Sequence, residues 1–172
     1  MQGHVLTMPP ATWDRVWRHL LPDDTDREQA AFLYCRYRTQ TSGTHFEVAD
    51  LRLLEGADFA SQCSDYIELT DAARIGLIKH AHATSTCLAE LHSHPGPWPA
   101  AFSRADRRGL LETVPHMRWR LKGAPYLAMV VATTGYDALV WAVSTTPEPL
   151  LFIEAGDRRI PPENRSLEGW KR

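Results

Sequence analysis

One short segment constrains the fold more than any other part of the chain, because it predicts a strand, a rigid loop and a helix start in direct succession. Residues 87–92 are predicted to form a strand that leads into the loop. Prolines at positions 95, 97 and 99 stiffen that loop. Ser103 then opens a predicted helix, with Asp106 three positions later. The segment therefore predicts a loop that carries the helix start back to the end of the strand.

The histidines of this segment, together with its aspartate, form a candidate metal site. Side chains two positions apart in a strand point to the same face, so His92 and His94 can bind one ion. Asp106 adds a carboxylate on the first turn of the following helix. Zinc prefers four nitrogen, oxygen or sulfur ligands, and catalytic zinc sites take three of them from the protein. We therefore predict that His92, His94 and Asp106 bind Zn²⁺.

These residues also have purely structural interpretations. Ser103 and Asp106 have the spacing of a capping box, but an aspartate on the first helical turn can cap the helix and hold zinc at once. A single histidine is more often a hydrogen-bonded structural residue, whereas the pair followed by Pro95 favours a metal. His80 and His82 form a second His-x-His pair within a helical pattern. Residues two apart on a helix do not face one another, so these two are expected to be surface histidines.

The whole chain predicts one mixed α/β domain. Its central sheet is expected to be mixed, mainly antiparallel and flanked by helices. Predicted helices cover 10–21, 70–82 and 103–113, the last one ended by Pro115. Predicted strands cover 30–38, 46–54, 66–69, 87–92, 126–132 and 138–143, the last two joined by a turn at 134–137. The domain is expected to span residues 1–157, followed by a polar surface tail at 158–172.

Composition and charge narrow the function classes. The 172 residues carry a formal net charge of -2 and no long run of Lys or Arg, which argues against a general nucleic-acid binder. Three cysteines without a Cys-x-x-Cys spacing predict neither a disulfide framework nor a thiolate zinc site. The N-terminus lacks a basic segment followed by an apolar one, and no stretch approaches the ~18 apolar residues of a membrane span. We expect a cytoplasmic protein without a membrane partner.

The order His92-x-His94-Pro95 followed by Ser103-x-x-Asp106 resembles the signature of the JAMM metallopeptidases, also called the MPN+ or Mov34/PAD-1 family, whose fold is the JAB domain. The family motif includes a glutamate far upstream, on the first core strand and just before a run of small and apolar residues, and Glu28 matches that position. The resemblance covers roughly residues 10 to 145. Within this family, the compact length of the chain resembles that of bacterial deubiquitinase-like members.

The resemblance implies a zinc-dependent hydrolysis and a role for each motif residue. Water activated by the metal would attack an amide carbonyl, with Glu28 as general acid/base and Ser103 as hydrogen-bond donor to the oxyanion. Members of the family typically cut after the C-terminal tail of ubiquitin or a ubiquitin-like protein. The implied substrate is therefore a ubiquitin-like protein or its conjugates, in a bacterial conjugation or antiphage defence system. Residues 56–65 and 116–126 are candidate contacts for the tail.

Several alternatives stay open from the residues alone. Glu90 lies two positions before His92, on the same face of the strand, and rivals Glu28 as the general acid/base. Trp98 and Phe102 are either core residues or substrate contacts. Two other functions are compatible with the motif: a non-catalytic scaffold of the MPN fold, and a RadC-like, DNA-linked protein. The sequence predicts neither the particular modifier nor the oligomeric state nor the need for an activating partner.

Overall fold

The computed structural model describes residues 3–170. Three α-helices are present, α1 (Pro10–Leu20), α2 (Asp71–Thr84) and α3 (Arg104–Arg120). The strands are β1 (His4–Met8), β2 (Ala30–Gln40), β3 (Gly43–Leu53), β4 (Phe59–Gln62), β5 (Ile67–Leu69), β6 (Cys87–Ser93), β7 (Tyr126–Ala132), β8 (Gly135–Trp141), β9 (Glu148–Ala155) and β10 (Arg158–Ile160). Short 3₁₀ helices occupy Gly56–Asp58 and Glu168–Trp170. None of the described helices is long and apolar enough to cross a membrane.

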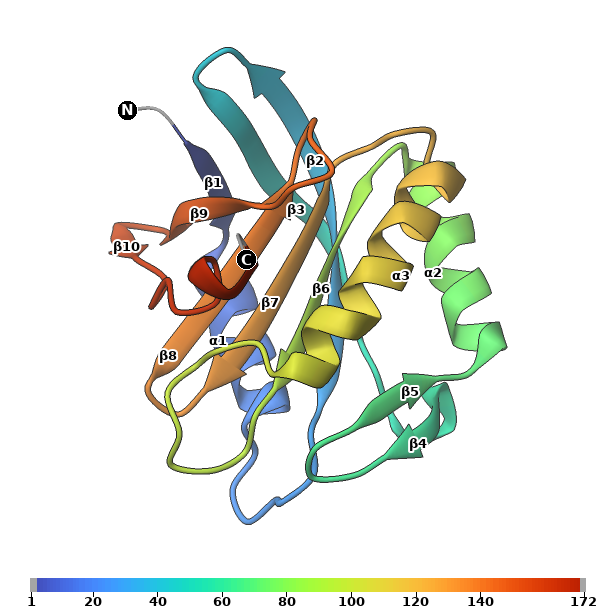
Figure 1. The fold of residues 1–172 in the computed structure, drawn as a ribbon, viewed down its shortest axis with the longest axis vertical. Coiled ribbons are helices and arrows are strands. Elements are labelled where there is room, and N and C mark those ends of the chain that lie inside the picture. The colour runs from blue at the N-terminus through green and yellow to red at the C-terminus, as the bar shows by residue number, and fades with distance from the viewer. Residues whose placement is uncertain (1–2, 171–172) are drawn as a thin grey trace.

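Eight of the strands form one sheet in the order β1-β3-β2-β6-β7-β8-β9-β10 (Figure 1). The pairs β1–β3, β1–β9 and β6–β7 are parallel, and the other pairs are antiparallel. The prediction of a mixed, mainly antiparallel sheet is therefore confirmed. The prediction of a simple sheet flanked by helices needs correction, because β1 pairs with both β3 and β9 and so closes the sheet on itself. β4 and β5 form a separate hairpin.

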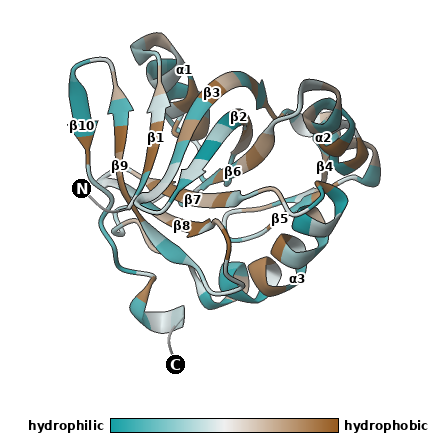
Figure 2. Ribbon diagram, turned by 90° about the horizontal axis from the view of Figure 1, so that it is seen from above, coloured by the Kyte–Doolittle hydropathy of each residue, from teal (hydrophilic) through white to brown (hydrophobic). Residues whose placement is uncertain are grey.

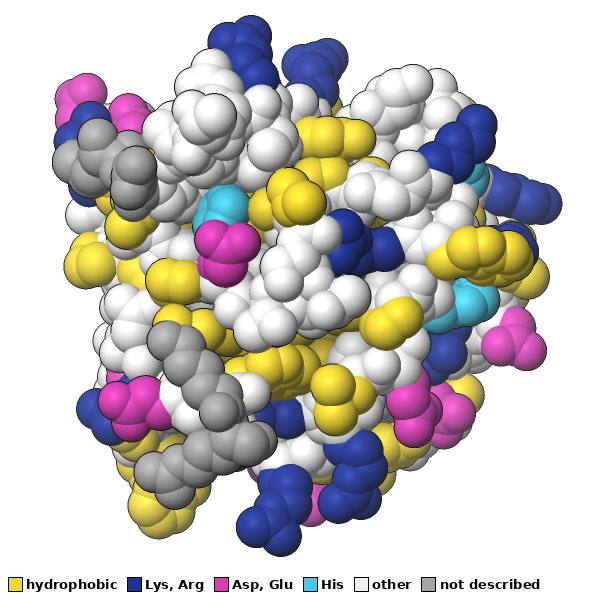
Figure 3. All heavy atoms as spheres, turned by 45° about the horizontal axis from the view of Figure 1, so that its top comes forward, with side chains coloured by type: hydrophobic (Ala, Val, Ile, Leu, Met, Phe, Trp, Pro, Cys, Tyr) yellow, Lys and Arg dark blue, Asp and Glu magenta, His cyan; other side chains and the backbone are white. Residues whose placement is uncertain are grey.

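The helices cover different parts of this closed sheet. α2 and α3 lie together on one side of it, whereas α1 lies apart from them (Figure 2). α1 packs through Trp13, Val16 and Leu20, which are buried, and Trp13 meets Tyr136 of β8 edge to face. Seen with the top of Figure 1 turned forward, the surface carries basic and acidic side chains interspersed with hydrophobic ones (Figure 3).

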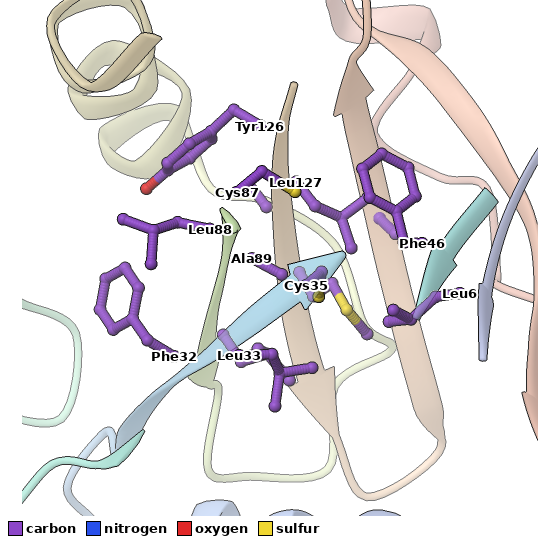
Figure 4. Packing of buried hydrophobic residues seen from close by; sticks show 14 of the residues in the cluster. Leu6, Phe32, Leu33, Cys35, Phe46, Cys87, Leu88, Ala89, Tyr126 and Leu127 are labelled. Atoms are coloured by element: carbon purple, nitrogen blue, oxygen red, sulfur yellow. The ribbon is translucent and has the colours of Figure 1, made fainter. Parts of the chain in front are cut away.

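The strict alternation of side chains in β2 and β6 separates two layers of the core. The pairs Phe32–Glu90 and Tyr34–Leu88 lie on the face that α2 and α3 cover, and the pair Leu33–Ala89 lies on the opposite face. Figure 4 shows Phe32, Leu88 and Tyr126 on the helix side, and Leu33, Leu6 and Phe46 on the other. Because His92 follows Glu90 at the same two-residue period, β6 delivers its imidazole to the helix-covered face.

Several predicted element ends differ from the structure: β2 extends to Gln40, β3 begins at Gly43, and β8 spans Gly135–Trp141 instead of 138–143. α3 continues through Pro115 to Arg120, although proline was expected to end it. The carbonyl of Leu111, which would otherwise bond to residue 115, lies on an exposed turn where water can hydrate it, while Val114 and Met117 stay buried. The hairpin turn lies at 133–134 rather than 134–137, because Ala132 already pairs with Gly135.

The C-terminal segment is not the polar surface tail that was expected. Its first residues form β10, which pairs with β9. Further along, Ser166 is 2% exposed, and its backbone N–H donates to Asp137 Oδ2 at 2.8 Å. Trp170 meets Trp141 edge to face with ring centroids 5.5 Å apart. The described part of the predicted tail is thus packed against β8 and β9.

Candidate metal centre

The pairing of β6 with its neighbours places the two histidines. His92 lies opposite Ala30 of β2, whose small side chain leaves room for the imidazole. His94 directly follows β6, and its backbone N–H donates to the carbonyl of Val131 at 2.8 Å, which extends the pairing with β7 by one residue. Both imidazoles therefore project from one strand end toward the start of α3.

A capping box at the start of α3 places the aspartate. Ser103 Oγ accepts from the backbone N–H of Asp106 at 3.1 Å, and Asp106 Oδ2 accepts from the backbone N–H of Ser103 at 2.6 Å. The same carboxylate faces the imidazoles. Capping and metal binding are therefore compatible uses of Asp106, as the sequence predicted, because a carboxylate oxygen can accept more than one interaction.

The candidate ligand atoms of this group lie at separations close to those around a tetrahedral metal ion. Nε2 of His92 and Nε2 of His94 lie 3.2 Å apart, and these atoms lie 3.5 and 3.2 Å from Oδ1 and Oδ2 of Asp106. A tetrahedral zinc ion at ordinary bond lengths separates its ligand atoms by roughly 3.3–3.5 Å. Among residues 3–170, this is the one group of three His, Cys, Asp or Glu residues so arranged that it could hold a metal ion. The residues therefore fit zinc in type and in spacing.

Glu28 lies beside this group, although it comes far earlier in the sequence than the two histidines. Its Oε1 is 3.5 Å from His94 Nε2, and the residue is 5% exposed. Burial raises the pKa of the Glu28 carboxyl to about 7, although the neighbouring histidines lower it in part. A carboxyl whose pKa lies near neutrality can both accept and return a proton. The structure thus brings Glu28 together with the three predicted ligands.

Glu90, the rival acid, is engaged elsewhere. Its carboxylate accepts a hydrogen bond from the Tyr126 hydroxyl. Burial raises the pKa of Glu90, which that hydrogen bond offsets only in part. The contacts therefore favour Glu28, rather than Glu90, as the acid beside the imidazole of His94.

The group of three is electrostatically interdependent. Burial alone would raise the pKa of Asp106, but hydrogen bonds from His92 and His94 hold it well below its usual range. Burial alone would lower the pKa of His92, yet the hydrogen bond and charge of Asp106 raise it overall. The negative charge of the Asp106 carboxylate and a positive charge on the imidazoles therefore stabilise each other.

The loop between β6 and α3 is held in part by Ser166 and Asp137, two residues that the sequence did not single out. The Phe102 ring meets His92 edge to face at 5.8 Å, and the backbone N–H of Phe102 donates to Ser166 Oγ at 2.8 Å. Ser166 in turn is held by Asp137. Phe102 is 3% exposed and Trp98 is 72% exposed, so Phe102 is a core contact of the site and Trp98 is a surface residue. Hydrogen bonds between residues so far apart leave no local pattern that a sequence could show.

A groove of about 600 Å³ opens beside the metal group. Its walls come from the β4–β5 hairpin, α2 and α3, and its floor includes Phe32, Glu90 and His92. From the two segments predicted to contact a substrate tail, only Asp65, His116 and Met117 line it. The larger share of the hairpin wall comes from residues 66–69, just after the first of those segments.

The second His-x-His pair lies away from this site. His80 pairs with Asp50 at 3.1 Å, and His82 Nε2 contacts the carbonyl of Arg120 at 2.6 Å. The two side chains therefore have separate partners.

The fold and the site together define an α/β domain with a candidate metal centre beside a groove. The sequence matches the family described as prokaryotic homologs of the JAB domain over residues 9–145, and the chain belongs to that family. The family includes metallopeptidases and also members without activity. No curated protein matches the chain.

Proposed function

We propose that the chain is a zinc-dependent peptidase or isopeptidase that cuts after the C-terminal tail of a ubiquitin-like protein. One observation supports this proposal: two imidazole nitrogens and the carboxylate of a third residue approach one another to 3.2–3.5 Å, and the buried Glu28 carboxyl lies beside them. A structural His–Asp cluster would not require a second, buried acid next to it. A scaffold without catalysis would have no use for that acid, since its burial is unfavourable.

Each motif residue has a defined task in this reaction. When bound, zinc supplies the Lewis acidity that lowers the pKa of water toward about 7 and polarises a carbonyl. His92, His94 and Asp106 would hold the ion. Glu28, whose carboxyl lies 3.5 Å from His94 Nε2, would accept the proton of the attacking water and return it to the leaving amine.

Ser103 would stabilise the developing oxyanion. Its Oγ already accepts a hydrogen bond from the backbone of Asp106. The hydroxyl hydrogen is therefore left to donate, and a hydroxyl can accept and donate at the same time. A donor aimed at developing negative charge is worth about 3 kcal/mol of the barrier in comparable hydrolases.

The groove supplies a place for an extended tail. It leads to His92 and Asp106 between the β4–β5 hairpin and α3, and β5 is only three residues long. An extended chain can bind beside such a strand through backbone hydrogen bonds. We further propose that the protein acts in the cytoplasm of a bacterium, in a ubiquitin-like conjugation or antiphage defence system.

Cleavage of defined fusions tests this function. The zinc-loaded protein is incubated with ubiquitin-like proteins that carry a C-terminal fusion, and the products are identified by mass spectrometry. We expect cleavage directly after the tail by the wild type and none by His92→Ala. A zinc-loaded protein that cuts no tail fusion would instead be a non-catalytic binding module, and unchanged cleavage by His92→Ala would exclude the mechanism.

A further inference from the structure

The backbone of Glu28 and Gln29 is held from two sides, although neither residue belongs to a helix or strand. β2 begins only at Ala30. The N–H of Glu28 donates to the carbonyl of Cys63 at 2.9 Å, and the carbonyl of Glu28 accepts from the side-chain amide of Gln62 at 2.8 Å. Both backbone groups of Glu28 are therefore bound by the end of β4 and the residue after it.

The second side of this contact comes from the residue between the two histidines. The N–H of Gln29 donates to Ser93 Oγ at 2.8 Å, and the carbonyl of Gln29 accepts from the Ser93 N–H at 2.9 Å. Ser93 is fully buried. The pairing continues the register of β2 and β6, in which Ala30 lies opposite His92, and it brings Glu28 next to His94.

Gln62 joins the two halves of this arrangement. Its amide nitrogen also donates to Gln29 Oε1 at 3.1 Å, so one side chain binds both residues of the segment. Figure 1 shows the β4–β5 hairpin reaching the start of β2 at the end of the molecule where β6 stops. The hairpin thus contacts the Glu28 segment through Gln62 and Cys63, while its residues 65–69 line the groove.

We propose that Gln62 and Ser93 are positioning residues that hold the Glu28 carboxyl against the metal group. This inference rests on the proposed role of Glu28. A segment outside the regular helices and strands keeps one conformation only while its polar groups are bound. Loss of the Gln62 amide would free the Glu28 carbonyl, and a misplacement of about 1 Å in a reacting group can slow a reaction by about 100-fold.

Three variants separate positioning from general damage. Gln62→Met keeps the length of the side chain and removes both donors, and Gln62→Glu keeps the shape but cannot donate to a carbonyl when ionised. Gln40→Met makes the same chemical change at the far end of β2, at an exposed position, and serves as the matched control. Values of kcat and KM are measured with a tail fusion, and zinc affinity is measured by competition with a chelator.

We expect kcat to fall about 10- to 100-fold in both Gln62 variants, with KM within about twofold and zinc affinity unchanged. Gln40→Met is expected to match the wild type. Full activity in Gln62→Glu would show that the donor is not needed, and a raised KM with normal kcat would assign Gln62 to the groove wall. Either result overturns the proposal.

A second readout does not depend on activity. Hydrogen exchange of the Glu28 and Gln29 amides is measured in the metal-free and zinc-loaded protein. We expect exchange at Glu28 to accelerate at least tenfold in Gln62→Met, and exchange at Gln29 to do so in Ser93→Ala, with no change in Gln40→Met. If the wild type cuts no substrate, the proposed function fails and the exchange rates alone decide. Unchanged exchange in both variants would refute the positioning role.

Discussion

Glu28 should make the stability of the metal-free protein depend on pH in a specific direction. Its carboxyl has a pKa of about 7 in the folded protein, against 4.5 for an ordinary glutamate, because it is buried. A raised pKa means that folding disfavours the charged form. The resulting loss of stability is absent below about pH 4.5, grows between pH 4.5 and 7, and is complete above pH 7.

The size of this effect follows from the two pKa values. A pKa difference of one between the folded and unfolded protein corresponds to about 1.4 kcal/mol of stability. The difference between the two pKa values of Glu28 therefore corresponds to about 3 kcal/mol. The groove beside the site admits water, which screens the charge, and we therefore expect about 2 kcal/mol. Glu28→Gln removes the ionisable group, so the variant should gain that amount relative to the wild type between pH 4.5 and pH 8.

Urea denaturation of chelator-treated protein measures this difference. Unfolding free energies of wild type and Glu28→Gln are compared at pH 4.5 and pH 8, with Glu47→Gln, an exposed position on β3, as control. The reasoning is refuted if the gap between wild type and Glu28→Gln is the same at both pH values. It is also refuted if Glu47→Gln shows an equal change.

Three further predictions concern the residues around the metal group. Ser103→Ala should lower kcat about 100-fold through the lost donor and destabilise the fold by about 1 kcal/mol through the lost cap. Ser103→Thr should keep most of the activity and most of the stability. Cleavage rates and urea denaturation measure the two effects. Ser166→Ala leaves the N–H of Phe102 without its acceptor, so it should cost about 1–3 kcal/mol in a thermal melt and also weaken zinc binding. Asp106→Asn and His92→Ala should each lose stoichiometric zinc in equilibrium dialysis, and retention of zinc by either would remove that residue from the ligand set.

The elements around the motif could be predicted because their signals are local. Strand alternation places His92 and His94 on one face, and the Ser103–Asp106 spacing marks a helix start, as the capping box shows. The distances within the group could not be predicted, since they depend on how the loop folds back. The choice between Glu28 and Glu90 depended on family resemblance, because nothing local shows that Tyr126 binds the Glu90 carboxylate.

The closure of the sheet was not predictable from local patterns. β1 and β9 pair in parallel although they lie at opposite ends of the chain. β9 begins with Glu148 and Pro149, and proline removes a ladder donor, which weakens the strand signal of this segment. Asp137 was expected at the end of the hairpin turn at 134–137. It lies in β8, 1% exposed, because its carboxylate accepts backbone hydrogen bonds from the C-terminal segment.

Zinc content and cleavage, measured on the same preparations of wild type and Glu28→Gln, test the central claim most directly. Glu28 is not a predicted ligand, so both proteins should bind about one zinc ion per chain. Only the wild type should cut a tail fusion at an appreciable rate, with the variant slower by about 100-fold or more. Equal cleavage by both zinc-loaded proteins, or loss of zinc from Glu28→Gln, would contradict the assignment of Glu28 as the acid/base beside a site formed by His92, His94 and Asp106.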